Sequence, residues 1–448
     1  MLQKYTVFLA STNKKSAYKN RRYFFSLLFF LGTSVVNATP PEKLLTLSDA
    51  IQLALAENPS LKVFPIRDAA IQGQLQTANL KPAYEIAVET ENFAGTGGFT
   101  GVSGAELTVS LSSTIEMGDK RAARAGLYSQ SRSRLEAQQQ VESLELLGEV
   151  TRRYVDVLAA QERIILASEA TELAKMTLNG VKKRANAGST PEAEVKRAQA
   201  ALAQSQLTLL SGQQQLRYLK VALTALWGET SPDFTAVTGD LFNFGQDVDF
   251  STLYAKIKQN PAIQVFAAEE RLKDAEIRLA KTESTSNINW SVGVRRFQET
   301  SDTAITAGFS MPLFSSKRNS GAVSAALASR NEVSIQREVA LLNMHTQLFR
   351  AFSNRQQAIV SAQKLQSEIV PALEDALDET QEAYERGRYS YLDYVSARQE
   401  LLRARLTLIE SAAAALAYGA DIEQLTAEPL PASQYPPLTT ITYPNFKD

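Results

Sequence analysis

The side chains that commonly perform enzymatic or metal chemistry are nearly absent from this chain. It contains no cysteine and one histidine, His345, which excludes disulfides, thiolate ligands and imidazole clusters. We find no Ser-His-Asp order, no metal-ligand spacing and no phosphate-binding loop. Most carboxylates recur at helical spacing, which is typical of solvated surface charge. These patterns argue against an enzyme, a cofactor and a resident metal site.

Polar and apolar side chains alternate in four short segments of the chain. Alternation with a period of two predicts a β-strand with one apolar face. The four predicted strands cover about 84–93, 105–115, 288–297 and 303–313. Their polar faces carry Glu85, Glu89, Glu106 and Arg295. A pore lined by these faces would prefer cations.

Each predicted strand has roughly nine to eleven residues, the length that a tilted strand needs to cross a bilayer. A small soluble sandwich with one wet face is the alternative. Four strands cannot close a barrel alone, and an open edge in lipid leaves backbone groups unpaired at several kcal/mol each. Membrane insertion would therefore require an oligomer. Two copies provide eight strands, and three provide twelve strands around a lumen.

Long helical segments must position these strands. From about 120 to 187 and from about 317 to 386, apolar residues recur at intervals of three and four, and Pro371 is the only proline. Some sixty-five to seventy residues at about 1.5 Å each reach on the order of 100 Å. Gly188 and Gly387 suit left-handed C-caps at the two ends, and Pro191 suits the start of a returning helix. We therefore predict two long helical hairpins with tips at 188–190 and 387–390.

The two halves of the chain repeat one pattern. Both returning helices have a seven-residue apolar repeat, and the two series are offset by 199: Val195, Leu202, Leu209 and Leu216, and Tyr394, Leu401, Leu408 and Ala415. Small residues follow three positions after the first three members of each series. Such heptads predict left-handed coiled coils with closely spaced backbones. Each half also has a helix breaker, Asn58-Pro59 or Asn260-Pro261.

The N-terminal segment has the pattern of an export signal. A basic stretch precedes an apolar run of about fourteen residues and the small-residue cleavage site Val36-Asn37-Ala38. The run is shorter than the roughly twenty residues of a membrane-spanning helix, which is the alternative. We predict a signal peptide over 1–38, a first repeat over 39–228, a linker over 229–250, a second repeat over 251–427 and a tail over 428–448. Without the leader, 41 basic and 48 acidic side chains leave a net charge of −7, which argues against nucleic-acid binding.

In this order, and duplicated, these features resemble the outer membrane factors, the TolC-like exit ducts of tripartite efflux and secretion systems. The resemblance covers nearly the whole chain after residue 38. It includes the segment from Leu45 to Leu61 around Asn58-Pro59, the run from Ser310 to Phe314 after the fourth strand, and both glycine-tipped hairpins. It implies a mainly α fold with a small β part. A homotrimer would join four strands per chain into a twelve-stranded transmembrane β-barrel, and the coiled-coil hairpins would continue it as an α-barrel.

The resemblance also implies a location and partners. The duct would lie in the bacterial outer membrane, surrounded by lipid, and extend into the periplasm. It would passively conduct substrates from an RND-type inner-membrane pump and a periplasmic adaptor, the membrane fusion protein, with no cofactor. Adaptor contacts would lie at the tips, on Gly188, Ser189, Thr190, Gly387, Arg388 and Tyr389. The segment from Ile115 to Arg121 is similar to the CzcC-like branch for heavy-metal and cation efflux, and a general drug or solvent exporter is the alternative.

A gate at the tips is a further implication of the resemblance. Asp393 lies six residues after Gly387, where the family has an acidic residue that forms a ring in the trimer, and Tyr384 lies three residues before Gly387, where the family has a tyrosine. Glu194 takes the corresponding acidic position of the first hairpin. Tyr389 and Ser396 stand where the family usually has an arginine and a second acid. We expect Tyr384 to hydrogen-bond Glu194 and three copies of Asp393 to set the field at a constriction. The alternative is that both acids are solvated residues in the first turn of a helix.

Other classes fit the sequence less well. A type I protein-secretion exit duct shares the architecture and stays an alternative function. A periplasmic adaptor would have one hairpin flanked by β-rich halves instead of two equal copies. A purely structural coiled-coil scaffold would lack the four alternating segments.

Overall fold

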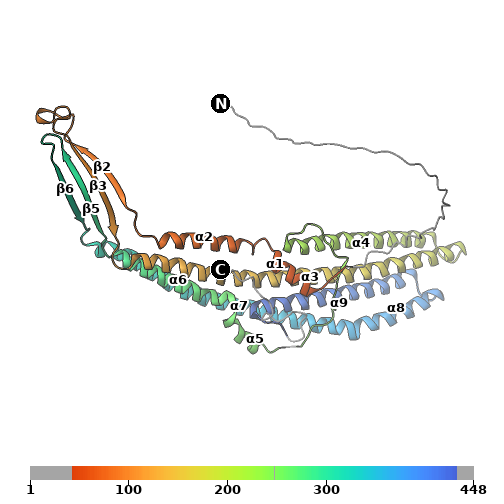
Figure 1. The fold of residues 1–448 in the computed structure, drawn as a ribbon. Coiled ribbons are helices and arrows are strands. Elements are labelled where there is room, and N and C mark those ends of the chain that lie inside the picture. Colours follow the sequence, from red (N-terminus) through yellow and green to blue (C-terminus); the bar gives the residue numbers. More distant parts are fainter. Residues whose placement is uncertain (1–42, 247, 431–448) are drawn as a thin grey trace, which may run out of the picture. The chain divides into compact units, whose positions relative to one another are not determined.

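The protein is described by a computed structural model that covers residues 43–246 and 248–430. Within these ranges the chain is mainly helical, with a four-stranded sheet (Figure 1) and a separate two-stranded sheet. The predicted signal peptide and residues 431–448 of the predicted tail lie outside the described residues. No helix in the described ranges is long and apolar enough to span a membrane.

Both halves of the described chain have two helices, a strand pair, a long helical segment and a returning helix, in that order; the short strands β1 and β4 occur in the first half alone. The first half contains β1 (Leu44–Leu45), α1 (Leu47–Glu57), α2 (Val63–Ala78), β2 (Glu85–Glu91), β3 (Glu106–Ile115), α3 (Lys120–Asn186), α4 (Glu192–Thr224) and β4 (Ala236–Val237). The second half contains α5 (Phe250–Lys256), α6 (Pro261–Glu283), β5 (Ile288–Phe297), β6 (Thr303–Ser310), α7 (Ser315–Lys364), α8 (Val370–Glu385) and α9 (Tyr391–Thr426). Short 3₁₀ turns lie at Gly97–Phe99, Ala225–Trp227 and Ile257–Gln259.

A π-helical turn joins α7 to α8. It covers Leu365–Ile369, and Pro371 follows in the first turn of α8. Proline lacks a backbone N–H, and its ring clashes with the carbonyl four residues earlier in a regular α-helix. A wider turn accommodates this misfit. The segment therefore stays helical from Ser315 to Glu385, in agreement with the predicted long helix.

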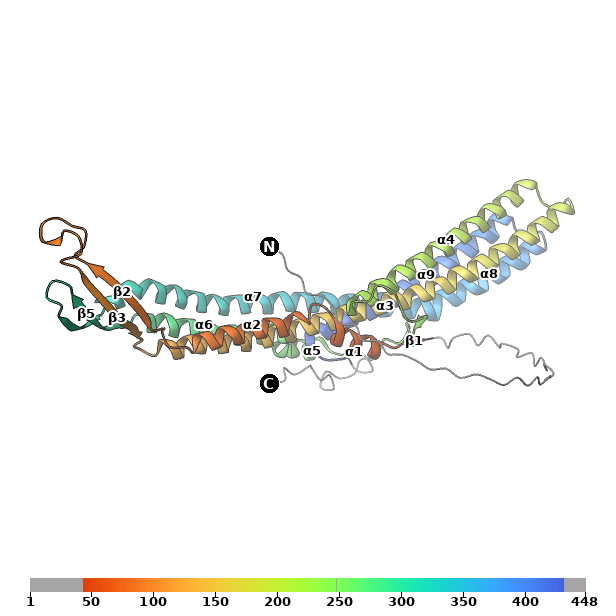
Figure 2. The ribbon, with the colours of Figure 1, turned by 45° about the horizontal axis from the view of Figure 1, so that its top comes forward.

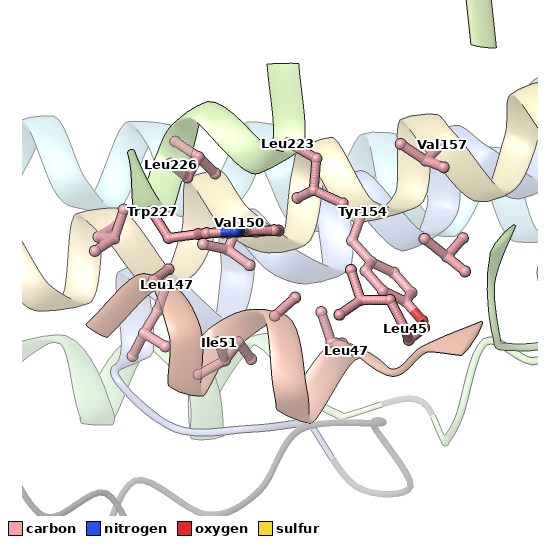
Figure 3. Close-up of a cluster of buried hydrophobic side chains, with 14 of the residues drawn as sticks. Leu45, Leu47, Ile51, Leu147, Val150, Tyr154, Val157, Leu223, Leu226 and Trp227 are labelled. Carbon is pink, nitrogen blue, oxygen red and sulfur yellow. Dashed lines mark hydrogen bonds between the residues drawn. The ribbon is translucent and has the colours of Figure 1, made fainter. Parts of the chain in front are cut away.

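The largest hydrophobic core forms where α1 packs against α3 and the end of α4 (Figure 3). Ile51 and Val150 are fully buried there, and burial of each such side chain contributes about 1.5–3 kcal/mol. Tyr154 of α3 is 2% exposed. Its hydroxyl donates to the Leu45 carbonyl at 2.8 Å and accepts from the Thr238 amide at 3.0 Å. These bonds hold the parallel β1–β4 pair against α3.

The two Asn-Pro breakers make equivalent contacts, which supports the duplication. Asn58 is buried, and its side-chain N–H donates to the Leu226 carbonyl at 2.7 Å, beyond the end of α4. Asn260 is buried, and its side-chain N–H donates to the Gln424 carbonyl at 2.8 Å, near the end of α9. Each asparagine also accepts a bond from a backbone N–H two residues later, as a helix-start residue does. In each half, the breaker therefore ties a short helix to the returning helix.

The two long hairpins, α3–α4 and α8–α9, pack on each other through the α3–α9 contact (Figure 2). A second core near the tips draws buried residues from all four helices. Val195 and Ala198 supply the α4 side, and Tyr394, Leu401 and Ala404 supply the α9 side. These residues belong to the predicted heptad and small-residue series. The repeat thus marks the packing seam of the hairpins.

Candidate functional site: the sheet faces and the hairpin tips

The four-stranded sheet is antiparallel throughout, in the order β2-β3-β5-β6. Its register separates the two faces by polarity. Glu85, Glu89, Glu106 and Arg295 share one face, with Thr108, Ser110, Ser112 and Ser291 between them. The sequence-predicted polar positions are therefore brought together on one surface.

The opposite face of the sheet is exposed and mostly apolar, with Thr90, Arg296 and Thr303 in the row nearest the hairpin loops. Its members include Ile86, Val88, Leu107, Val109, Leu111, Val292, Val294, Ile305 and Phe309. Ile305 is 81% exposed and Phe309 is 85% exposed. A continuous apolar face of this kind marks contact with another protein or with lipid.

The sheet also has two open edges. β2 pairs only with β3, and β6 pairs only with β5, within the described chain. Unpaired edge strands offer a row of backbone N–H and C=O groups to another strand. The sheet is therefore built to be continued on both sides.

Arg295 organises the charges on the polar face. Its guanidinium donates to Glu106 Oε2 at 2.9 Å and to Thr108 Oγ1 at 2.9 Å. Its Nη2 also lies 2.8 Å from Glu91 Oε2. Glu91 and Glu106 are direct partners in the register, so Arg295 separates two carboxylates that would otherwise repel each other.

Glu91 is a polar-face residue that the sequence analysis missed. Glu91 lies two residues after Glu89, so the same alternation that placed Glu85 and Glu89 on the polar face also predicts this position for Glu91. Glu85 and Glu89 are exposed and form no ion pair in the described part of the chain. The face thus carries four carboxylates and one guanidinium, a net charge of −3 per chain.

Both hairpin tips end in the same glycine motif. Gly188 has φ +75° and Gly387 has φ +76°, the left-handed region that glycine enters without strain. The next residue in each tip bonds back into the helix: Ser189 N–H to the Arg184 carbonyl at 2.9 Å, and Arg388 N–H to the Ala383 carbonyl at 2.8 Å. These are Schellman caps. Gly188, Ser189, Gly387, Arg388 and Tyr389 are exposed and Thr190 is half-buried.

The predicted hydrogen bond from Tyr384 to Glu194 is not formed within the chain. Tyr384 is only 8% exposed, and its hydroxyl has no hydrogen-bond partner. Its ring lies under the Arg184 guanidinium at 4.4 Å and stacks on Tyr394 with centroids 5.6 Å apart. Burial raises the pKa of the Tyr384 hydroxyl. The packing of the ring, instead of a hydroxyl bond, connects this tyrosine to the first hairpin.

Besides Tyr384, the tie between the hairpins uses residues that were not predicted to belong to the gate. Arg184 of α3 donates to the Tyr384 carbonyl at 2.7 Å. Thr177 of α3 lies 3.2 Å from the Tyr394 hydroxyl and accepts a long bond from Arg398 at 3.4 Å. Tyr394 belonged to the heptad series, but nothing in the sequence paired it with Thr177 across more than two hundred residues.

Asp393 caps a helix. Its carboxylate accepts from the Ser390 hydroxyl at 2.7 Å and from the Ser390 N–H at 3.0 Å, while Ser390 Oγ accepts from the Asp393 N–H. This capping box starts α9. The hydrogen bonds from Ser390 hold the Asp393 pKa below its usual value. Asp393 and Ser396 are exposed, and Glu194 is half-buried in the first turn of α4.

Across the described residues, no group of three or more histidine, cysteine, aspartate or glutamate side chains is placed to hold a metal ion. The acidic side chains of the sheet are instead distributed along one face. The arrangement offers a charged surface and a packed, capped pair of tips.

Comparison with known proteins assigns the family. The family described as "Outer membrane efflux protein" matches residues 50–229 and 252–428. The cobalt-zinc-cadmium resistance protein CzcC of Cupriavidus metallidurans is 25% identical over 377 residues, covering 84% of this chain and 88% of that protein. The nickel and cobalt resistance protein CnrC of the same organism is 26% identical over 297 residues, covering 64% of this chain and 69% of that protein.

Solved structures share the fold. The outer membrane protein VceC of Vibrio cholerae aligns with a TM-score of 0.67 at 18% identity, covering 86% of this chain and 96% of that one. The open state of the MtrE outer membrane channel of Neisseria gonorrhoeae aligns with a TM-score of 0.68 at 17% identity, covering 87% and 91%. The chain therefore belongs to the outer membrane efflux protein family, the non-enzymatic outer-membrane channels of tripartite efflux pumps.

Proposed function

We propose that three copies of this chain close a twelve-stranded barrel and export divalent metal cations. The observation that supports this most strongly is the sheet, which has one exposed apolar face and two open edges. Backbone groups at a sheet edge must be paired inside a membrane, so β2 of one copy would join β6 of the next. The apolar face would then contact lipid and the polar face would line the lumen.

The charge of the polar face supports a cation as substrate. Each chain contributes a net charge of −3 there, so a trimer would carry −9 around one lumen. Rings of carboxylates raise the local concentration of cations and repel anions. The relatives that match are named for resistance to cobalt, zinc, cadmium and nickel. Selection of the metal would belong to the pump, because the duct has no resident metal site among its described residues.

The hairpin tips are the proposed contact with a periplasmic adaptor and, through it, with an RND-type pump. They expose Gly188, Ser189, Arg388 and Tyr389, and Tyr389 is a large hydrophobic side chain with half its surface free. Asp393 lies exposed one turn behind the second tip, where three copies would form the proposed constriction.

A resistance assay tests this function. We expect deletion of the gene to sensitise the native host to cobalt, zinc, cadmium or nickel, and plasmid-borne wild-type protein to restore growth. Ile305→Asp, on the apolar face, should fail to restore growth because it places a charge in lipid. The adjacent control Thr306→Asp lies on the polar face and should restore it.

Several results of the same assay would contradict the proposal. Sensitivity to drugs or solvents without sensitivity to metals would favour a general exporter. Loss of a secreted protein without a change in resistance would favour the type I secretion alternative. Equal failure of Ile305→Asp and Thr306→Asp would reject the assignment of the two faces.

A further inference from the structure

We propose that the pocket where β3 enters α3 binds the head group of a phospholipid, with the lipid chains lying on the apolar face of the sheet. The inference rests on the outer-membrane location and on the proposed lipid contact of that face. The pocket has a volume of about 770 Å³. It is lined by parts of 79–84, 113–122 and Trp290.

The aromatic wall of the pocket opens onto the apolar face. Trp290 faces Ser113 in the register and lies on the same side of the sheet as Val292 and Val294. Tyr84 precedes β2, and its ring meets the Trp290 ring edge to face with centroids 6.3 Å apart. Tyrosine and tryptophan favour the membrane–water boundary, where a ring can be apolar at one end and wet at the other. The pocket therefore lies at the boundary that a lipid head group would occupy.

The cationic wall contains two unpaired side chains. Lys81 and Arg121 line the pocket, are exposed, and form no ion pair among the described residues. Lys120 also lines it but is buried and paired with Glu283 at 3.4 Å. Lys81 and Arg121 are therefore the groups available to a phosphate.

The acidic side chains of the pocket differ in availability. Glu116 is occupied by Arg124, whose Nη2 donates to Glu116 Oε2 at 2.9 Å while Nη1 bonds the other oxygen. Asp119 is exposed, unpaired, and makes no side-chain cap to α3. One free carboxylate beside two free cations matches a zwitterionic head group, in which an ammonium accompanies a phosphate. Phosphatidylethanolamine has this chemistry, and its ammonium can donate hydrogen bonds to Asp119.

Two contacts fix the walls of the pocket in place. Ser113 Oγ donates to the Ala83 carbonyl at 3.0 Å, which ties the 79–84 segment to the end of β3. Gly118 has φ +75°, and a Cβ at this position would lie 2.8 Å from Thr285 Oγ1. Only glycine allows this turn to pack so closely. The segment from Ile115 to Arg121 thereby builds a binding pocket at the base of the sheet.

Tryptophan fluorescence can test the inference on the full-length protein. The chain has two tryptophans, and Trp227 is buried in the main core. Delipidated protein in detergent is titrated with phosphatidylethanolamine carrying brominated acyl chains, which quench nearby indoles. We expect saturable quenching that disappears in Trp290→Phe. The double variant Lys81→Ala/Arg121→Ala should bind about tenfold more weakly.

Controls separate a site from bulk lipid and from free phosphate. Lys182→Ala/Arg337→Ala removes the same charges from exposed positions on α3 and α7 and should bind like the wild type. Asp119→Asn should reduce the preference for phosphatidylethanolamine over brominated phosphatidylglycerol. Equal quenching in both double variants would overturn the inference, as would displacement of the lipid by millimolar inorganic phosphate. Channel conductance of the same preparations is recorded in parallel. If the wild-type protein conducts ions but shows no saturable quenching, the lipid site is rejected while the proposed channel function is not.

Discussion

Replacement of Arg295 by glutamine should make the channel more selective for cations. Arg295 is the only cation on the polar face of the described sheet, where it contacts Glu91 and Glu106. Its loss would change the net charge of that face from −3 to −4 per chain, and from −9 to −12 in a trimer. Selectivity follows the sign and density of fixed charge along a lumen.

The same substitution should also weaken the sheet. Glu91 and Glu106 face each other in the register, so their Cβ atoms lie about 5 Å apart. Two unit charges at this distance repel by roughly 1 kcal/mol in water and by about 3 kcal/mol at an effective dielectric constant of 20. We therefore expect Arg295→Gln to lower the free energy of unfolding by about 1–3 kcal/mol per chain. Arg295→Gln combined with Glu91→Gln should recover most of this loss.

Reversal potentials in planar bilayers under a tenfold KCl gradient measure the selectivity. A perfectly cation-selective pore would reach about 59 mV, and Arg295→Gln should lie closer to this limit than the wild type. Glu89→Gln should move in the opposite direction. Arg296→Gln is the matched control, because Arg296 is the neighbouring arginine on the apolar face. Equal shifts in Arg295→Gln and Arg296→Gln, or a shift of Arg295→Gln toward anions, would refute the assignment of the lumen.

Three further predictions concern the core and the tips. Tyr154→Phe should lower the free energy of unfolding by about 0.5–1.5 kcal/mol, because the Leu45 carbonyl and the Thr238 N–H then keep their bond to each other but lose the buried hydroxyl. Hydrogen exchange at 43–45 and 236–238 should become faster, and unchanged exchange there would contradict the role of the hydroxyl. The pKa of Asp393 is lowered, so its capping bonds contribute fully above the usual aspartate pKa of about 4 and are lost as the pH falls through the lowered value. In exchange data corrected for intrinsic rates, the start of α9 should therefore be protected at pH 5 and should fray progressively during acid titration below pH 4. Asp393→Asn should fray already at pH 5. Tyr384→Phe should leave the melting temperature unchanged or raised, whereas Arg184→Ala should lower it; destabilisation by Tyr384→Phe would reveal a partner for the hydroxyl outside the described chain.

Periodic signals in the sequence predicted the elements well. The alternation in Glu106–Ile115 and Ile288–Phe297 predicted both the strands and their faces, because successive side chains of a strand point to opposite sides of the sheet. The heptads marked the seams of α4 and α9 because packing repeats along a helix. The Asn-Pro pairs were visible only as helix breakers, since the bond from Asn260 to the Gln424 carbonyl depends on distant backbone.

The contacts at the tips were harder to predict. Counting residues from the tip glycine gives the position of a residue along the helix axis, but not which neighbouring side chain it contacts. Tyr384 was expected to hydrogen-bond Glu194, but its ring packs on Arg184 and Tyr394 and its hydroxyl has no hydrogen-bond partner among the described residues. Arg184 lies two hundred residues from Tyr384 in the sequence, and no local pattern joins them.

Cross-linking of the open sheet edges tests the central claim most directly. The chain has no cysteine, so any disulfide must come from introduced residues. Ala87→Cys on β2 is combined in turn with Ala304→Cys, Thr306→Cys and Gly308→Cys on β6, all on the polar face. In isolated outer membranes, oxidation should convert at least one of these pairs into covalent dimers and trimers, and into nothing larger. Only monomers from all three pairs, with the protein present in the outer membrane, would contradict a barrel closed edge to edge by three copies.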